Sequence, residues 1–194
     1  MKKWIVQLIV LWSLAFGLNS LVACAQVNVD ERNAEPQREQ NCELDNSHLQ
    51  AMPIVNVRFT RPNGSRFAAK ARLANNDTTR GAGFQRVCAS TIQAMPILFA
   101  FNREALVKFH MNNVVAPIDI AFIDKQGRIE SFQAMQPYSL IAIKKPLYGP
   151  KRPVMYAFEA HPGYFKQHEL PLKSRFSWVL SVRSISPPSS AWLW

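Results

Sequence analysis

The feature that most constrains the fold is a succession of short apolar segments separated by turn signals. Residues 54–60 alternate apolar and polar side chains, as expected of a strand with one buried face. The Asn63-Gly64 pair that follows is typical of a tight hairpin turn. Residues 97–101 are all apolar, a run long enough for a buried strand and too short for a helix. The same patterns predict further strands at residues 66–73, 107–111, 118–123, 128–135, 140–143, 154–160 and 176–182.

About eight strands with one or two short helices predict a mainly β, single-domain protein, either a β-sandwich or a small β-barrel. The clearest helical turn begins after Asn76 or Asp77, whose side chains can cap it, and ends at Gly81 or Gly83. We expect the β domain to span residues 51–183, which is long enough to bury a core.

The first 23 residues have the pattern of a signal peptide. Lys2 and Lys3 precede an apolar stretch that polar residues interrupt, which makes it too short for a membrane-spanning helix. The sequence Leu-Val-Ala-Cys ending at Cys24 matches a lipoprotein box and predicts lipidation of that thiol. Alternatively, ordinary cleavage after a small-x-small site leaves Gln26 as the first residue. Both alternatives predict export to the periplasmic side of the cell envelope, and the first predicts a membrane anchor.

The segments that flank the β domain have few features of a packed fold. Residues 24–50 are polar and without apolar periodicity, so we expect a spacer between the membrane and the domain. Residues 184–194 contain Pro187-Pro188 and end in two tryptophans around Leu193, a composition that does not readily extend a sheet. We expect a loose C-terminal tail.

Two cysteines remain in the mature chain after Cys24 has been lipidated or removed. In an oxidising compartment, Cys42 and Cys88 are expected to form a disulfide, worth about 4 kcal/mol by the chain-entropy estimate. The alternative is a pair of separate buried thiols. They form no C-x-x-C motif, which argues against a redox role.

The chain carries a formal net charge of +10. A basic exported domain is attracted to anionic surfaces such as phospholipid headgroups or acidic glycans, and nucleic acid is not expected as a partner in that compartment. The predicted partners are the membrane, through Cys24, and an anionic envelope component or another envelope protein.

A series of motifs resembles a known family. The motifs occur in order at residues 80–86, 96–101, 109–113 and 117–124, followed by Gly127 and a later stretch at 156–163. They are similar to the signature of the bacterial and archaeal family called domain of unknown function 192, over residues 55–182. This resemblance implies a compact, mainly β domain, often exported, with no established reaction.

Asp119 is a carboxylate in an apolar strand and needs partners. Strand periodicity places it on the face opposite Ile118, where an unpaired carboxylate would cost several kcal/mol, on the order of 2–7 for a polar group. We interpret Asn112, Asn113 and nearby backbone N–H groups as a clasp that binds it. The alternative is that Asp119 contacts a ligand or acts as a catalytic acid. Asp124 begins an Asp-Lys-Gln-Gly turn.

His110 is the main candidate for a catalytic base. It lies between Phe109 and Met111, so its side chain points away from theirs and toward a cleft if one exists. No nucleophile lies near it in the sequence. An enzyme would therefore be a hydrolase that uses His110 with Asp119 or Glu159, and it would require these side chains to converge in one cavity.

Metal chemistry has weaker support. Glu159 and His161 are two residues apart, and His168 and Glu169 follow, but the spacing matches no standard zinc motif. Phosphate-binding loops and nucleophile elbows do not occur in the sequence. We predict no metal and no cofactor.

The sequence therefore predicts an exported, lipid-anchored, non-catalytic module for binding or interaction, with a periplasmic hydrolase as the alternative. Its ligand-binding candidates are His110, Asn112, Asn113, Asp119 and Glu159.

Overall fold

A computed structural model describes residues 41–139 and 141–181 of the chain. The predicted signal peptide, Cys24, the first part of the spacer and the C-terminal tail lie outside the described residues. None of the described helices is long and apolar enough to cross a membrane.

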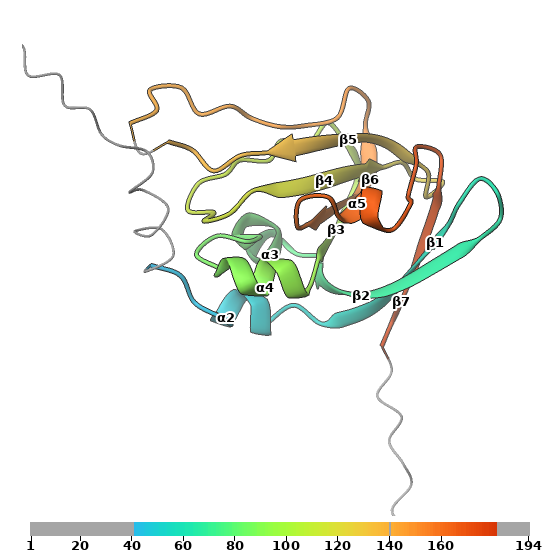
Figure 1. Ribbon diagram of the computed structural model, residues 1–194, viewed down its shortest axis with the longest axis horizontal. Helices are drawn as coiled ribbons and strands as arrows, with labels where there is room; N and C mark the ends of the chain where they lie inside the picture. Colours follow the sequence, from blue (N-terminus) through green and yellow to red (C-terminus); the bar gives the residue numbers. More distant parts are fainter. Residues whose placement is uncertain (1–40, 140, 182–194) are drawn as a thin grey trace, which may run out of the picture.

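Seven strands form one sheet in the described part of the chain (Figure 1). They are β1 (Ile54–Thr60), β2 (Arg66–Ala74), β3 (Ile97–Ala105), β4 (Ile118–Ile123), β5 (Ile129–Met135), β6 (Val154–Ala160) and β7 (Arg175–Leu180). Their order in the sheet is β5-β4-β6-β3-β2-β1-β7. Among these seven described strands, β2 and β3 form the one parallel pair, and two helices connect them. The mainly β, single-domain prediction is confirmed.

The sheet is strongly curled but does not close into a barrel. Its edge strands β5 and β7 meet only at one end, through a bridge between Arg128 and Arg175. There the N–H of Phe176 donates to the carbonyl of Gly127 at 2.6 Å. Gly127 has φ of 75°, and a Cβ at this position would lie 2.4 Å from the Phe176 carbonyl oxygen. Glycine therefore permits the close approach, and the architecture is a single half-closed sheet.

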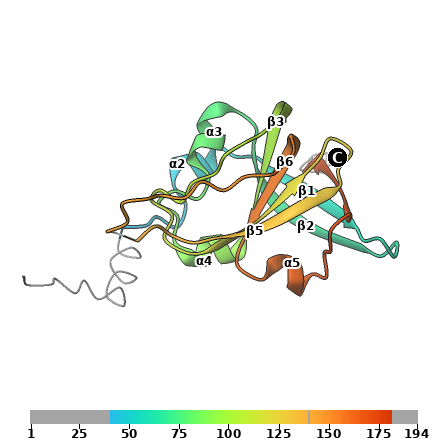
Figure 2. The same ribbon diagram turned by 90° about the horizontal axis from the view of Figure 1, so that it is seen from above.

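Four short helices accompany the sheet among the described residues: α2 (Ser47–Gln50), α3 (Asp77–Ala82), α4 (Ala89–Ala94) and α5 (Tyr164–Gln167). Asn76 caps α3, and Gly83 ends it with φ of 49°, as the sequence predicted. Figures 1 and 2 show α2, α3 and α4 gathered near one end of the sheet, whereas α5 lies apart, after β6. The predicted number of helices, one or two, was too low. The helices α2, α4 and α5 were missed because each is one or two turns long and lacks a periodic apolar face.

Two predicted strands are wrong. Residues 107–111 form no strand; Phe109 and Tyr148 exchange two backbone hydrogen bonds and make an isolated bridge. Residues 141–143 lie in a turn, where the side chains of Ile141 and Ile143 are exposed. Residues 107–111 alternate apolar and basic side chains and residues 141–143 are apolar, but neither run pairs along its length with a described strand.

The domain begins earlier than predicted. The Cys42–Cys88 disulfide forms as expected, with 4.9 Å between the Cα atoms. Glu43 adds two backbone hydrogen bonds, one to Arg86 and one from Cys88. Leu49 of α2 is fully buried, so residues 41–50 belong to the domain rather than to the spacer.

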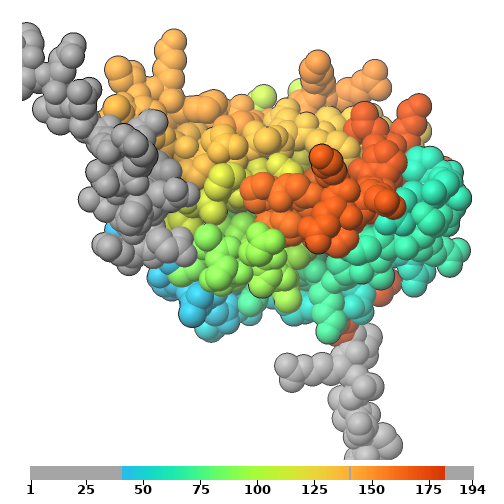
Figure 3. Space-filling model, viewed as in Figure 1, coloured from blue at the N-terminus to red at the C-terminus, as the bar shows by residue number. Residues whose placement is uncertain are grey.

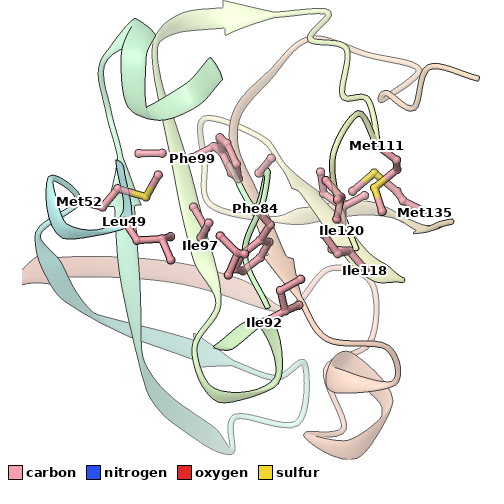
Figure 4. Packing of buried hydrophobic residues seen from close by; sticks show 14 of the residues in the cluster. Leu49, Met52, Phe84, Ile92, Ile97, Phe99, Met111, Ile118, Ile120 and Met135 are labelled. Atoms are coloured by element: carbon pink, nitrogen blue, oxygen red, sulfur yellow. The ribbon is translucent and has the colours of Figure 1, made fainter. Parts of the chain in front are cut away.

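The two faces of the sheet carry separate apolar cores. The α5-side core packs Phe59, Phe158 and Phe176 inside the curl, against Tyr164 and Phe165 of α5. The α4-side core lies on the other face, beneath α2, α4 and the connection between β3 and β4. Figure 4 shows this second core, from Leu49 and Met52 at one end to Met111 and Met135 at the other.

Candidate functional site

A cavity of about 280 Å³ opens on the α4-side face of the sheet. Three segments form its walls: residues 80–85 from α3 onward, the aromatic side chains of Phe99 and Phe101 in β3, and residues 107–111. Glu159 of β6 lines the same cavity. Walls that are largely apolar, with several phenylalanine rings, and a single buried acid make this cavity the candidate site.

Glu159 is the buried acid of the cavity. Its neighbours across the sheet are Ile97 of β3 and Ile120 of β4, which belong to the α4-side core. Only 4% of the residue is exposed. Within the described part of the chain, its carboxyl makes no hydrogen bond or ion pair, although burial of an unpaired carboxyl is costly.

Burial raises the pKa of Glu159 to about 8. The carboxyl is therefore protonated at neutral pH, since the charged form is the one that burial disfavours. A protonated carboxyl offers one O–H donor and a carbonyl acceptor. The cavity thus holds a neutral group able both to donate and to accept a hydrogen bond.

Small residues keep the space beside this carboxyl open. Gly83 has φ of 49°, a conformation that favours glycine. A Cβ at Gly83 would lie 3.5 Å from the ring of Phe99 and 3.8 Å from Oε2 of Glu159. A larger side chain there would extend toward the carboxyl and reduce the cavity.

Basic side chains lie around the cavity. Lys108 and His110 line it and are exposed. Arg80 also lines it; its guanidinium donates to the Ala100 carbonyl and pairs with Asp77 at 2.6 Å. Nδ1 of His110 accepts a hydrogen bond from the backbone N–H of Asn112 at 3.3 Å. His110 and Glu159 therefore belong to one cavity.

Asp119 lies on the opposite face of the sheet. In the β4–β6 ladder it pairs with Ala160, one residue beyond Glu159, so the two carboxyls point to different sides. Oδ2 of Asp119 accepts a hydrogen bond of 2.8 Å from the N–H of Gly163. The predicted backbone clasp exists, but the asparagines do not contribute to it. Among the described residues, Asp119 does not line the cavity that His110 lines.

The two asparagines have other partners. Asn113 donates through Nδ2 to the side chain of Gln85 at 3.2 Å, and its carbonyl accepts from the N–H of Arg86 at 2.7 Å. These bonds join the β3–β4 connection to the segment after α3. Asn112 and Asn113 line a second recess of about 610 Å³, which also includes Lys145. The asparagines therefore line this second recess and do not bind Asp119.

The side chains considered for a metal site, and not predicted to form one, lie on different sides of the sheet. His161 and His168 contact the ring of Tyr164 with centroid distances of 5.3 and 4.5 Å, on the α5 side. Burial, together with His161 and Arg61, lowers the pKa of His168. Glu159 faces the other side. No group of three or more metal-ligating side chains occurs within residues 41–139 and 141–181.

Asp124 has a structural role. Its Oδ1 accepts from the N–H of Arg128, and its Oδ2 accepts from the guanidinium, both at 2.8 Å. Burial alone would raise the pKa of Asp124, but these hydrogen bonds lower it below its usual value. The predicted turn is confirmed.

Sequence reasoning missed Arg80, Gly83 and Lys108 as cavity residues. Two features of the sequence could have indicated this cavity. They are the three consecutive small residues after Arg80 and the single glutamate in the apolar strand that faces them. The contact between the two segments is long-range, and no local pattern indicates it.

The comparisons with known proteins agree with this fold. A family model described as "Uncharacterized ACR", domain of unknown function 192, matches residues 58–178. A solved protein from Sinorhizobium meliloti 1021, described as a "putative transcription regulator", has a TM-score of 0.56 and 23% identity, over 65% of this chain and 94% of that one. A protein of unknown function from Novosphingobium aromaticivorans DSM 12444 has a TM-score of 0.55 and 17% identity, over 73% and 96%. At these identities the likeness concerns the fold alone. A comparison with curated proteins found no significant match.

Proposed function

This chain belongs to the domain of unknown function 192 family, and we propose that it is a non-catalytic module that binds a small anionic ligand in the Glu159 cavity. One observation carries the proposal. Glu159 is buried, unpaired within the described chain, and borders a cavity large enough for a small molecule.

A ligand is the natural partner for this carboxyl. A buried polar group left without a hydrogen bond costs roughly 1–3 kcal/mol, and a ligand that supplies the bond removes this cost. The aromatic rings of Phe99 and Phe101 favour an apolar body next to the polar group.

The charges around the cavity favour an anion. Protonated Glu159 adds no negative charge at neutral pH. Lys108 lines the cavity and makes no ion pair within the described residues, while Arg80 already pairs with Asp77. An anionic group at Lys108 and a hydrogen bond to Glu159 are therefore the expected contacts.

We place this module on the periplasmic side of the envelope, held there by lipidation of Cys24. The support is the signal-peptide pattern of residues 1–23, and the Cys42–Cys88 disulfide, which fits an oxidising compartment. The intact mass of the membrane-extracted protein tests the anchor. A chain beginning at Gln26 without lipid would contradict it.

Ligand-observed NMR with matched probes tests the cavity. Hexanoate and benzoate are expected to bind, whereas hexylamine and benzylamine bind at least tenfold more weakly. Binding of the carboxylates should weaken as the pH rises through about 8, because ionised Glu159 repels them. The Glu159→Gln variant keeps a neutral polar group, so it should bind without this pH dependence.

The matched control is Asp119→Asn, which changes a carboxyl on the opposite face. It should leave carboxylate binding and its pH dependence unchanged. A preference for the amines, or no binding of either probe class, would overturn the proposal.

A hydrolase is the second candidate, because His110 and Glu159 line the same cavity. A protonated glutamate can serve as a general acid and a histidine as a general base. Turnover of p-nitrophenyl esters or glycosides that is lost in both His110→Ala and Glu159→Gln would favour the enzyme. The binding proposal expects no turnover.

A further inference from the structure

The segment between β5 and β6 exposes large aliphatic side chains. Ile141, Ile143 and Leu147 are 62%, 99% and 61% exposed. We call residues 141–152 the projecting segment; in the space-filling view its side chains stand out from the upper edge of the molecule (orange, Figure 3). Three exposed aliphatic residues within seven positions indicate a surface that contacts something other than water.

This exposure belongs to an ordered turn. The N–H of Ala142 donates to the carbonyl of Ser139 at 3.1 Å. The hydroxyl of Tyr138 donates to the carbonyl of Pro146, and Nζ of Lys145 lies 5.8 Å from the centre of the Tyr138 ring. The turn therefore holds its aliphatic side chains outward instead of folding them onto the domain.

Basic residues accompany the aliphatic ones. Lys144, Lys145, Lys151 and Arg152 are all exposed. None of them forms an ion pair with a described residue, and residues 136–153 contain no aspartate or glutamate. The segment thus combines apolar tips with uncompensated positive charge.

We propose that the projecting segment docks on an anionic phospholipid bilayer. Ile141, Ile143 and Leu147 enter the interface between headgroups and acyl chains, while the lysines and Arg152 contact the phosphates. Shallow insertion of aliphatic side chains beside basic ones is the chemistry that recognises such a surface. A nucleic acid would leave the aliphatic tips unburied, and an apolar protein groove would leave the four charges unpaired.

Docking has a consequence for the cavity. The Phe109–Tyr148 bridge attaches the projecting segment to the wall that carries Lys108 and His110. The cavity therefore adjoins the docked surface. This inference does not depend on the proposed ligand, since none of the three aliphatic residues lines the Glu159 cavity.

A fluorescent probe in the full chain tests the insertion. In a Cys24→Ser background the other two cysteines are bonded, so one added thiol can be labelled with bimane. Ile143→Cys places it on the projecting segment. The control is Leu172→Cys, because Leu172 is 50% exposed and lies just before β7. Any anchoring by other parts of the chain is the same in the two labelled variants.

Vesicles containing phosphatidylglycerol and brominated lipid should quench the probe at position 143 and shift its emission to the blue. With vesicles of phosphatidylcholine alone, the quenching at position 143 should be at least tenfold smaller. The probe at position 172 should stay in water with either kind of vesicle. Equal quenching at both positions, or an unquenched probe at 143, overturns the proposal. So does a shift at 143 that follows protein concentration without lipid, since that indicates a protein surface.

Charge reversal separates this segment from the general charge of the chain. The Lys144→Glu/Lys145→Glu variant should lower partition into phosphatidylglycerol vesicles at least tenfold, and added salt should weaken the docking of the unmodified chain. Lys70→Glu/Lys173→Glu has the same net charge and changes exposed lysines elsewhere. An equal loss in both variants would show that the projecting segment is not the docking site.

Discussion

Glu159 and Asp119 are close neighbours in the β4–β6 ladder with opposite environments. Asp119 pairs with Ala160 and Glu159 pairs with Ile120, so a shift of one residue separates the two carboxyls onto two faces. Asp119 is partly exposed and accepts a backbone hydrogen bond. Glu159 is buried and has no partner within the described chain. The comparison separates a carboxyl with a backbone partner from the carboxyl that we propose binds a ligand, within the same sheet.

The segments that cover the two faces of the sheet cause the difference between the two carboxyls. On the α5 side, the chain turns back after β6 and presents the N–H of Gly163 to Asp119. On the α4 side, Gly83 approaches Glu159 without donating to it and leaves a cavity. The identity of the strand residue does not decide its role; the loop that covers its face does.

The largest effect is expected for Glu159→Gln on stability. Burial raises the pKa of Glu159 from 4.5 to about 8, so its contribution to stability is full below pH 4.5 and is lost as the pH rises through 8. At about 1.4 kcal/mol for each tenfold change in the acid constant, the loss is roughly 4–5 kcal/mol. Urea unfolding from pH 4 to pH 9 should show the variant gaining relative stability over this window.

The control for that measurement is Asp119→Asn, because it changes a carboxyl of the same sheet. For each variant, the quantity compared is its free energy of unfolding minus that of the unmodified chain. This difference should rise between pH 4.5 and 8 for Glu159→Gln and should not rise for Asp119→Asn. A flat difference for Glu159→Gln itself would mean that the carboxyl has a partner or reaches water.

A smaller loss is expected for Asp119→Ala. The substitution leaves the N–H of Gly163 without its acceptor, which costs about 1–2 kcal/mol of the free energy of unfolding. Urea unfolding at pH 7 measures the loss. Binding of hexanoate should be unchanged, and a loss of binding would show that the two faces of the sheet are coupled.

The smallest stability effect is expected for His110→Ala. The side chain is exposed, and its one hydrogen bond, from the N–H of Asn112, is 3.3 Å long, so the change should stay within about 0.5 kcal/mol. Hexanoate binding should still be affected, because His110 lines the cavity. Urea unfolding and NMR binding, measured on the same sample, give the change in stability and the change in hexanoate affinity. A large loss of stability would assign His110 a structural role.

Local patterns predicted much of the fold. The predicted bounds of β1, β4 and β6 agree with the structure, because each is a β-branched or aromatic run between turn residues. The cap of α3 at Asn76 and the Asp124 turn depend on contacts within four residues. The disulfide was predicted from two cysteines that remain in a chain with a signal-peptide pattern.

Ile141 and Ile143 show where such patterns fail. An apolar run predicts burial only if another segment covers it, and here the turn after β5 leaves both side chains exposed. The hydrogen-bond partner of Asp119 could not be predicted from local patterns either, because Gly163 is 44 residues away in the sequence.

By itself, the sequence determined where the seven observed strands lie, although it also predicted two that do not form. It determined the capped helix, the turn chemistry, the cysteine pair and the family as well, since each depends on short-range periodicity or on the identity of a few residues. Only the tertiary structure decided that the sheet curls without closing and that His110 lines one cavity with Glu159 and not with Asp119. The physical reason is that strand periodicity assigns a side chain to one of two faces. The elements that cover each face, and the cavity they leave, come from contacts between segments far apart in the chain.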